Sequence, residues 1–338
     1  MARPPRIVIA TLVAAAVLIT GCGSDDGTGG IKAPEGSSQS EFARQLKTAQ
    51  TVTAADFPAT GERSLQQIAD TTAASGTQVG LATSLFVPGT NRLAFGVIDA
   101  KNAFVYGKSA VYVARSPSSP AQGPFPAPAD ALITEPAFRS QTAASESSPI
   151  AAVYAAQLPL ARKGSYAVLV VTKTATGLVG AATQIEVRAD SPIPAVGERP
   201  PAIETDTISS ANGDVKSIDT RLPAARELHE KSLKDVLGKQ PVVLLFATPQ
   251  LCQSRVCGPV VDIELQLQAR YGDRVAFIHQ EVYVDNQVDK GLRKPLRDFH
   301  LQTEPWLFTF DRSGRVAARL EGSFGTRAFE QAITAALR

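Results

Sequence analysis

The stretch PVVLLFATPQLCQSRVCGPVV, residues 241–261, decides the fold of the second half of the chain. After an initial proline, five consecutive apolar residues extend to position 246, as expected for a central strand that is buried on both faces. A loop then carries Cys252, and Cys257 stands directly before Gly258 and Pro259. Proline is tolerated where a helix begins, because its missing N–H would have no partner there. The stretch therefore predicts a buried strand, a loop and a helix that begins close to the second cysteine.

Helices and strands alternate in the sequence pattern on both sides of this stretch. The predicted elements are a helix over 228–238 that ends at a glycine cap, a helix over 260–271, strands over 275–279 and 282–284, a helix over 290–299, a hairpin over 306–320 and an amphipathic helix over 326–337. Alternation of this kind is typical of an α/β domain. We expect such a domain over residues 208–338.

The order of these elements resembles the thioredoxin fold, especially the membrane-tethered, extracytoplasmic thiol–disulfide oxidoreductases of the TlpA type. The resemblance is carried by the strand that enters a two-cysteine loop, by the terminal helix, and by TEPWLFTFDRSG at 303–314, which looks like the family's cis-proline strand and hairpin. It implies that Pro305 lies opposite Cys252 and Cys257 and shapes a substrate groove. It also implies that the two cysteines exchange disulfides with exported protein thiols or with an envelope redox partner, without a cofactor.

The spacing of the cysteines departs from that family, whose motif is C-x-x-C, whereas this chain has C-x-x-x-x-C. Two residues five positions apart in a regular helix are separated by about 7.5 Å of axial rise. A disulfide needs its Cα atoms about 4.4–6.8 Å apart. A bridge is therefore possible if Cys252 lies in the loop and Cys257 starts the helix, or if the first turn is distorted. We then expect Cys252 to be the nucleophile, Cys257 to resolve, and Arg255 to be a solvated loop charge.

Several alternatives remain open at this stage. The run from Cys257 to Val260 resembles the Cys-Gly-Pro-Cys of thioredoxin, which would make Cys257 the nucleophile. The disulfide could instead be a structural bridge in a non-catalytic binding scaffold. The Sco copper-delivery proteins are also tethered thioredoxin folds with two cysteines and a histidine, and His300 is the nearest histidine here. A faint similarity of Thr248 and the following Pro249 to peroxiredoxins suggests peroxide reduction, although the spacing to the cysteine is not kept.

An all-β sandwich is predicted ahead of this domain, over residues 41–188, because short strand-like runs alternate with Pro, Gly and Asn turns. A Pro-, Ala- and Ser-rich stretch at 116–148 interrupts it as an irregular excursion. Tyr166, which opens a strand after a glycine turn, resembles the tyrosine corner of immunoglobulin-like domains, so its hydroxyl should bond a nearby backbone group. The sandwich contains no cysteine, histidine or carboxylate cluster and favours a binding or spacer role. The proline-rich segment 189–207 is predicted to be a stiff linker.

The beginning of the chain predicts export. Residues 1–21 have an arginine-bearing start and an apolar run at 7–20 that is too short to cross a bilayer, as in a secretory signal peptide. The run ends in ITGC, at 19–22, which resembles the bacterial lipobox and implies that Cys22 is acylated. The Gly-rich residues 22–40 then read as a flexible tether. We expect a lipoprotein held at the cell membrane, on its extracytoplasmic face, through lipid on Cys22.

Composition narrows the function further. The chain has 338 residues and a formal net charge of +2, so no strong field favours nucleic acid or a charged membrane surface. Its three cysteines leave one pair besides Cys22, and a bridge within that pair is chemically allowed outside the cytoplasm. The sequence predicts no metal site. We expect His229 to be a solvated helix residue and His279 to be a polar strand tip.

Overall fold

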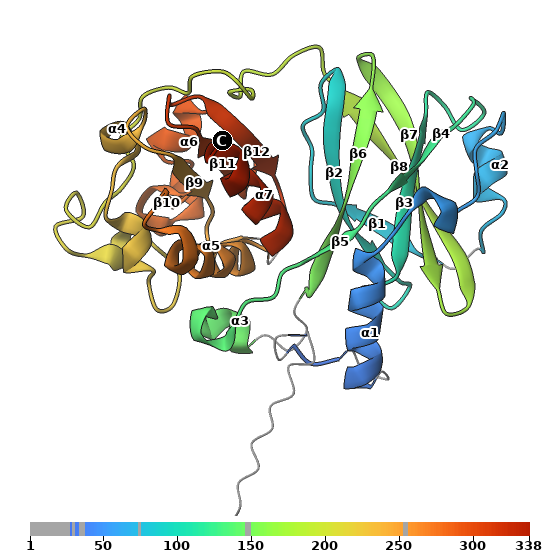
Figure 1. The fold of residues 1–338 in the computed structure, drawn as a ribbon, viewed down its shortest axis with the longest axis horizontal. Coiled ribbons are helices and arrows are strands. Elements are labelled where there is room, and N and C mark those ends of the chain that lie inside the picture. The colour runs from blue at the N-terminus through green and yellow to red at the C-terminus, as the bar shows by residue number, and fades with distance from the viewer. Residues whose placement is uncertain (1–27, 29–30, 34–37, 74–75, 146–149, 253–255) are drawn as a thin grey trace, which may run out of the picture.

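A computed structural model describes residues 28, 31–33, 38–73, 76–145, 150–252 and 256–338. Two parts lie side by side, a β-sandwich from the N-terminal half and an α/β unit from the C-terminal half (Figure 1). The predicted signal peptide, 1–21, and Cys22 lie outside the described residues. Among the residues described, no helix combines the length and apolar character needed to cross a membrane.

The β-sandwich consists of two antiparallel four-stranded sheets, with strand orders β1-β2-β6-β5 and β4-β3-β7-β8. The strands are β1 (Gln78–Leu81), β2 (Gly89–Ile98), β3 (Lys108–Ala114), β4 (Gln122–Pro126), β5 (Ala129–Ala131), β6 (Ala152–Leu160), β7 (Gly164–Thr174) and β8 (Gly177–Val187). Side chains of both sheets meet in one apolar core, which includes Phe95 and Tyr154 from one sheet and Val111 and Val168 from the other. This alternation of buried and exposed positions explains the period-two pattern of the sequence.

The turn between β6 and β7 carries the chain from one sheet to the other. There the backbone N–H of Arg162 donates to the Tyr166 hydroxyl at 3.2 Å, and the ring of Tyr166 is buried. This is the local hydrogen bond that the sequence predicted for a tyrosine corner. The bond holds the crossover between the sheets.

Helix α1 (Gln39–Gln50) covers the sandwich, and its N-cap Ser38 accepts a hydrogen bond from the Glu41 N–H. Its buried residues Phe42, Leu46 and Ala49 recur at helical spacing and join the sandwich core. The Gln39 side chain donates to the Ile31 carbonyl, and Ile31 is itself buried. Ile31 is thus held against the start of α1 by these contacts. A short helix α2 (Leu65–Ala69) covers the opposite sheet.

The C-terminal unit is built on a four-stranded mixed sheet with the order β10-β9-β11-β12. Strands β9 and β10 are parallel, whereas β11 is antiparallel to both of its neighbours. The elements are α4 (Leu233–Val236), β9 (Val242–Phe246), α5 (Cys257–Tyr271), β10 (Ala276–Gln280), α6 (Lys294–Asp298), β11 (Trp306–Phe310), β12 (Val316–Glu321) and α7 (Thr326–Ala336). This strand order, with a helix after β9 and another after β12, is the thioredoxin-like arrangement that the sequence predicted.

Strand β9 is buried along its whole length, as its continuous apolar run requires. One face of the sheet carries an aromatic cluster in which the ring of Phe308 lies 5.1 Å from that of Phe299 and 6.2 Å from that of Phe246. Trp306 stacks on Phe308 and is 2% exposed, so it belongs to this core. Edge-to-face and stacked rings of this kind stabilise a core beyond the area they bury.

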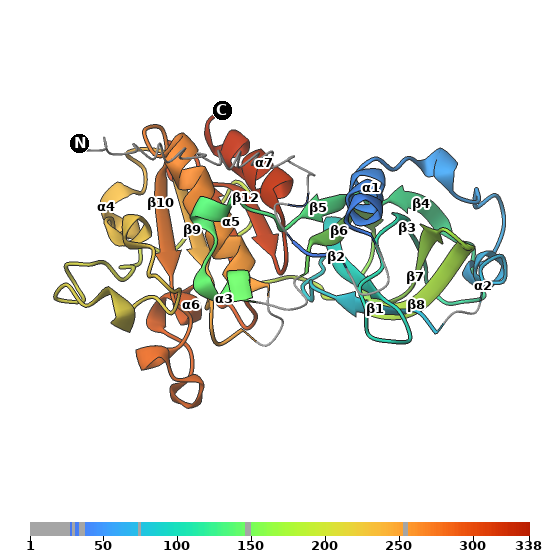
Figure 2. The ribbon, with the colours of Figure 1, turned by 90° about the horizontal axis from the view of Figure 1, so that it is seen from below.

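Two segments, which the sequence predicted to be an irregular excursion and a stiff linker, are packed against the thioredoxin-like domain. The excursion of the sandwich contains α3 (Gln141–Ser145), which lies against α5 (Figure 2). Beside it the Ser140 N–H donates to Asp262 at 2.9 Å, and Arg221 forms a buried ion pair with Asp262 at 2.8 Å. The linker also docks, because Ile203 is buried in the domain core and the Gly197 N–H bonds the Val316 carbonyl of β12. The stiff-spacer prediction for 189–207 is therefore incomplete.

The two parts meet at the end of β12, where backbones approach closely. Gly322 has a φ of +71°, and a Cβ at this position would lie 1.5 Å from the Ala82 carbonyl oxygen, so only glycine fits. Next to it Glu321 accepts hydrogen bonds from the Ser84 hydroxyl at 2.6 Å and the Leu85 N–H at 2.8 Å. Asp130 of β5 accepts bonds from the first N–H groups of α7.

We expect Asp130→Ala to destabilise the protein by about 2 kcal/mol or more, because it leaves the buried N–H groups at the start of α7 without an acceptor and removes a charge favoured by the helix dipole. Chemical denaturation followed by tryptophan fluorescence measures the effect, since Trp306 reports on the thioredoxin-like domain. The exposed Asp190→Ala is the matched control. Equal stability of the two variants would contradict the role of Asp130.

Candidate functional site

The site is positioned by the pairing of β9 with β11. Trp306, the first residue of β11, pairs with Phe246, the last residue of β9. The segment that precedes β11 therefore lies beside the loop that follows β9. In this way Glu304 and Pro305 come next to the cysteine loop, although they are some 50 residues further along the chain.

The two cysteines occupy the positions that a bridge would need. Cys257 is the first residue of α5, and Cys252 lies in the loop before it. Both are in the thiol form, and their sulfur atoms lie within 4.8 Å of each other. Cys257 is completely buried, whereas Cys252 is only partly buried. Arg255 lies outside the described residues, so its predicted place in solvent is not tested.

A carboxyl group completes the cluster. The Cys257 thiol donates to Oε2 of Glu304 at 3.6 Å, and Cys252, Cys257 and Glu304 form a group whose ligand atoms lie within 4.8 Å of one another. The peptide bond between Glu304 and Pro305 is cis, as the resemblance implied. Glu304 was not predicted from the sequence, where its one local signal is its place directly before the predicted cis-proline. His300 does not belong to this group, which disfavours the copper alternative built on it.

Burial makes this cluster reluctant to carry negative charge. The pKa of the Cys257 thiol is raised well above its usual value, first by burial and then by the neighbouring Cys252 and Glu304. Burial, followed by the negative charge of Cys252, raises the pKa of Glu304 to about 7. The pKa of Tyr283 is raised as well, first by burial and then by Glu304 and the two cysteines. Near neutral pH the Cys257 thiol is therefore protonated, whereas the Glu304 carboxyl group titrates close to that pH.

One hollow is lined by Cys252, and a second by the neighbouring residues Glu304 and Pro305. A pocket of about 400 Å³ is lined by Cys252, Pro249 and residues of α3. A larger and mostly apolar pocket of about 640 Å³ lies between the two parts of the molecule, with Glu304 and Pro305 on one wall and strands β1 and β8 on the other. Both halves of the chain therefore form the surroundings of the thiol pair.

The sequence predictions for two histidines were wrong. His229 was expected to be solvated and His279 to be a polar strand tip, but both side chains are fully buried. His229 lies in a short 3₁₀ helix, Arg226–His229, which folds over the end of β10. Local sequence patterns could not predict the burial of these two histidines, because it comes from packing between segments that are far apart in the chain.

No protein-family model and no curated protein matches this chain. Among solved structures, it is similar to a protein described as thiol:disulfide interchange protein DsbE from Chlorobium tepidum, at 18% identity and a TM-score of 0.31, over 43% of this chain and 99% of that one. It is also similar to a thioredoxin-family thiol:disulfide interchange protein from Chlorobium tepidum TLS. That match has 16% identity and a TM-score of 0.30, and it covers 44% of this chain and 100% of the other. At these scores the likeness carries no functional weight, and the fold assignment depends on the strand order described above.

The raised pKa of Glu304 predicts a specific pH dependence of stability. The ordinary carboxyl pKa is 4.5 and the folded value is about 7, so the folded state holds a proton that the unfolded chain has lost between these values. This group therefore lowers the stability of the wild type as pH rises from about 4.5 to 7. Glu304→Gln should become more stable relative to wild type across that window, with no further change below it.

Urea unfolding of the reduced protein at several pH values between 4 and 8 measures this difference. Exposed Glu62→Gln is the control and should run parallel to wild type. Parallel curves for Glu304→Gln as well would mean that Glu304 ionises at its ordinary pKa, and the electrostatic account of the cluster would then fail.

Proposed function

We propose that this protein is a lipid-anchored, extracytoplasmic thiol–disulfide oxidoreductase of the TlpA type, and that Cys252 and Cys257 are its redox pair. The observation that carries the proposal is the meeting of two thiols, one accessible and one buried, at the start of α5 beside the cis Glu304–Pro305 bond. The thioredoxin-like sheet supports the same chemistry. A purely structural scaffold would not need a buried carboxyl group with a pKa of about 7, such as Glu304, next to the sulfur atoms.

Cys252 is proposed as the nucleophile because it is only partly buried, whereas Cys257 is completely buried. Its thiolate attacks one sulfur of a substrate disulfide, a mixed disulfide forms, and the other substrate sulfur leaves as a thiolate that takes a proton. Cys257 starts a helix of 15 residues, whose unpaired N–H groups and dipole favour negative charge close to the pair.

Cys257 then resolves the mixed disulfide. Its thiol passes its proton to Glu304, whose carboxyl oxygen is 3.6 Å away and titrates near neutral pH. The new thiolate attacks the Cys252 sulfur, the Cys252–Cys257 bond forms, and the second substrate thiol is released. The substrate gains two electrons and the pair loses two. An envelope dithiol restores the pair, and the reverse sequence oxidises a substrate dithiol.

The β-sandwich is proposed to take part in substrate binding, and we interpret it as immunoglobulin-like. Its Tyr166 hydrogen bond at the crossover and its two antiparallel sheets support that class. The apolar pocket of about 640 Å³ joins the sandwich to the cis-proline segment. An extended, mainly apolar part of an exported protein fits a cleft of this character next to the thiols.

The location is proposed from the sequence alone. The signal-peptide pattern at 1–21 and the ITGC motif that ends at Cys22 support lipid attachment at the outer face of the cell membrane. Two or more acyl chains on one residue give durable anchoring, because each buried CH₂ contributes about 0.8 kcal/mol. The Cys252–Cys257 pair would then act in an envelope compartment where disulfide exchange takes place.

We expect Cys257→Ser to trap a mixed disulfide on Cys252, because no resolving thiol remains. Cys252→Ser should react with a bulky disulfide roughly tenfold more slowly or worse, because the Cys257 sulfur is buried and its pKa is raised. Both variants are compared in a Cys22→Ser background, which removes the third thiol. Reaction with a chromogenic aromatic disulfide and mass spectrometry of the product measure rate and adduct.

The reverse order of reactivity, with Cys257 the faster thiol, would favour the alternative in which Cys257 is the nucleophile. The reduction potential of the wild-type pair separates catalysis from a structural bridge. A value in the range of about −120 to −270 mV is expected for a cycling pair, whereas a value below about −300 mV would contradict the proposed function.

Lipid attachment has its own test. Full-length protein expressed in a bacterium with lipoprotein processing should partition into the detergent phase, and the mature N-terminal peptide should begin at acylated Cys22. Cys22→Ala should be exported without lipid or remain unprocessed, and should leave the detergent phase. Detergent partitioning that is the same with and without Cys22 would exclude the anchor but not the redox chemistry.

A further inference from the structure

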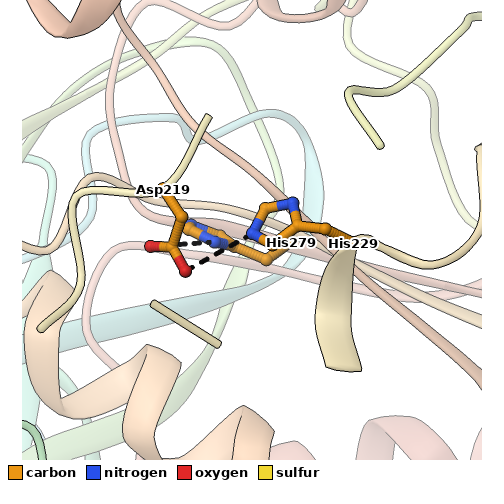
Figure 3. Close-up of side chains that lie close together, drawn as sticks. All are labelled: Asp219, His229 and His279. Atoms are coloured by element: carbon orange, nitrogen blue, oxygen red, sulfur yellow. Dashed lines mark ion pairs between the residues drawn. The ribbon is translucent and has the colours of Figure 1, made fainter. Parts of the chain in front are cut away.

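A second polar cluster lies inside the thioredoxin-like domain, apart from the thiol pair. Asp219, His229 and His279 meet in the interior with their side chains pointing at one another (Figure 3). All three side chains are fully buried. They come from a loop, a 3₁₀ helix and strand β10, so the fold brings them together from three separate segments. The redox proposal uses none of them.

The distances within this cluster fit a metal ion. Nε2 of His229 lies 3.4 Å from Oδ2 of Asp219, and Nδ1 of His279 lies 3.8 Å from Oδ1 of Asp219. The three ligand atoms are within 4.8 Å of one another. Zinc binds nitrogen and oxygen at 2.0–2.2 Å, so neighbouring ligands of a tetrahedral ion are about 3.3 Å apart. A small contraction of the cluster around an ion would reach that geometry.

The protonation of His279 leaves a lone pair without a donor. Its Nε2 is 2.9 Å from the Ala247 carbonyl oxygen, which can only accept, so Nε2 carries the proton. In the neutral ring Nδ1 is then an acceptor, and it faces a carboxylate oxygen, another acceptor. A histidine that donates one N–H to a backbone carbonyl and turns its other nitrogen inward has the usual arrangement of a metal ligand.

Asp219 and His229 also have atoms that are available to bind a metal ion. The Asp219 carboxylate is oriented by the N–H groups of Arg221 and Ala225, at 2.8 and 2.7 Å, and keeps lone pairs for the cluster. Nδ1 of His229 has no hydrogen-bond partner, and Nε2 has only the 3.4 Å contact with Asp219. Glu264 of α5 is also buried, and neither of its carboxyl oxygens has a hydrogen-bond partner. An unpaired buried polar group is costly, and a cation would relieve several at once.

We propose that Asp219, His229 and His279 form a binding site for one divalent transition-metal ion of the zinc type. Imidazole nitrogens with a carboxylate suit zinc and its neighbours in the periodic table, and do not suit calcium or magnesium. Because the site is closed to solvent, the ion enters as the protein folds and ties the segment around 219–229 to β10. Its role is structural, since all three ligand side chains are fully buried.

The test measures metal content in the full mature protein carrying Cys252→Ser and Cys257→Ser, which removes the thiolate cluster as a competing ligand set. Refolded with Zn²⁺ and desalted, it should retain about one zinc per chain. It should also melt on the order of 5–10 °C above protein refolded with a chelator. His229→Gln and Asp219→Asn should retain less than a tenth as much zinc, whereas exposed His300→Asn should match the parent.

Cobalt replaces zinc for a readout that does not depend on how well the variants fold. The parent loaded with Co²⁺ should show visible d–d bands of nitrogen and oxygen ligation. The same d–d bands should persist when the cysteines are restored, without a thiolate-to-cobalt charge-transfer band. A folded parent that binds neither metal, or zinc that is retained by Asp219→Asn, would overturn the proposal. Zinc bound only when Cys252 and Cys257 are present would assign the ion to the thiols and overturn it equally.

Discussion

The antiparallel pairing of β11 with β9 is the constraint on which the thiol site depends. The pairing places the start of one strand beside the end of the other, with Trp306 opposite Phe246. The residues of the thiol site lie just outside those two positions. The cysteine loop follows Phe246, and Glu304 and Pro305 precede Trp306. The aromatic rings of Phe308 and its neighbours stabilise this register, since a slip by one residue would turn them out of the core.

Burial then decides how the site behaves. Burial is the largest cause of the raised pKa of both Cys257 and Glu304, and the charge of Glu304 raises the pKa of Cys257 further. Cys252 lies less deeply in the fold, since it is only partly buried. This difference in depth is the basis for proposing Cys252 as the attacking sulfur and Cys257 as the resolving one.

Local sequence predicted the parts whose structure is dictated locally. The apolar run of β9, the helix that starts at Cys257 and the strand after Pro305 could be located because period, proline and cysteine spacing act over a few residues. Glu304 and the two buried histidines could not, because their surroundings come from distant segments. The packing of the linker and of the excursion against the thioredoxin-like domain could not be predicted for the same reason. A hydrogen bond such as that of Glu321 with Ser84 joins residues 237 positions apart and leaves no local pattern.

The Glu321 carboxylate also connects the β-sandwich to the segment that precedes β11. Glu321 holds Ser84 and Leu85 of the sandwich and, through the same carboxylate, the Thr303 hydroxyl at 3.0 Å. Thr303 stands directly before Glu304, and its hydroxyl also accepts from the Trp306 indole at 3.0 Å. The sandwich is therefore bonded to the very segment that sets the position of the carboxyl group against Cys257. A sandwich that only set a distance from the membrane would need no such contact, so the geometry favours its part in shaping the site.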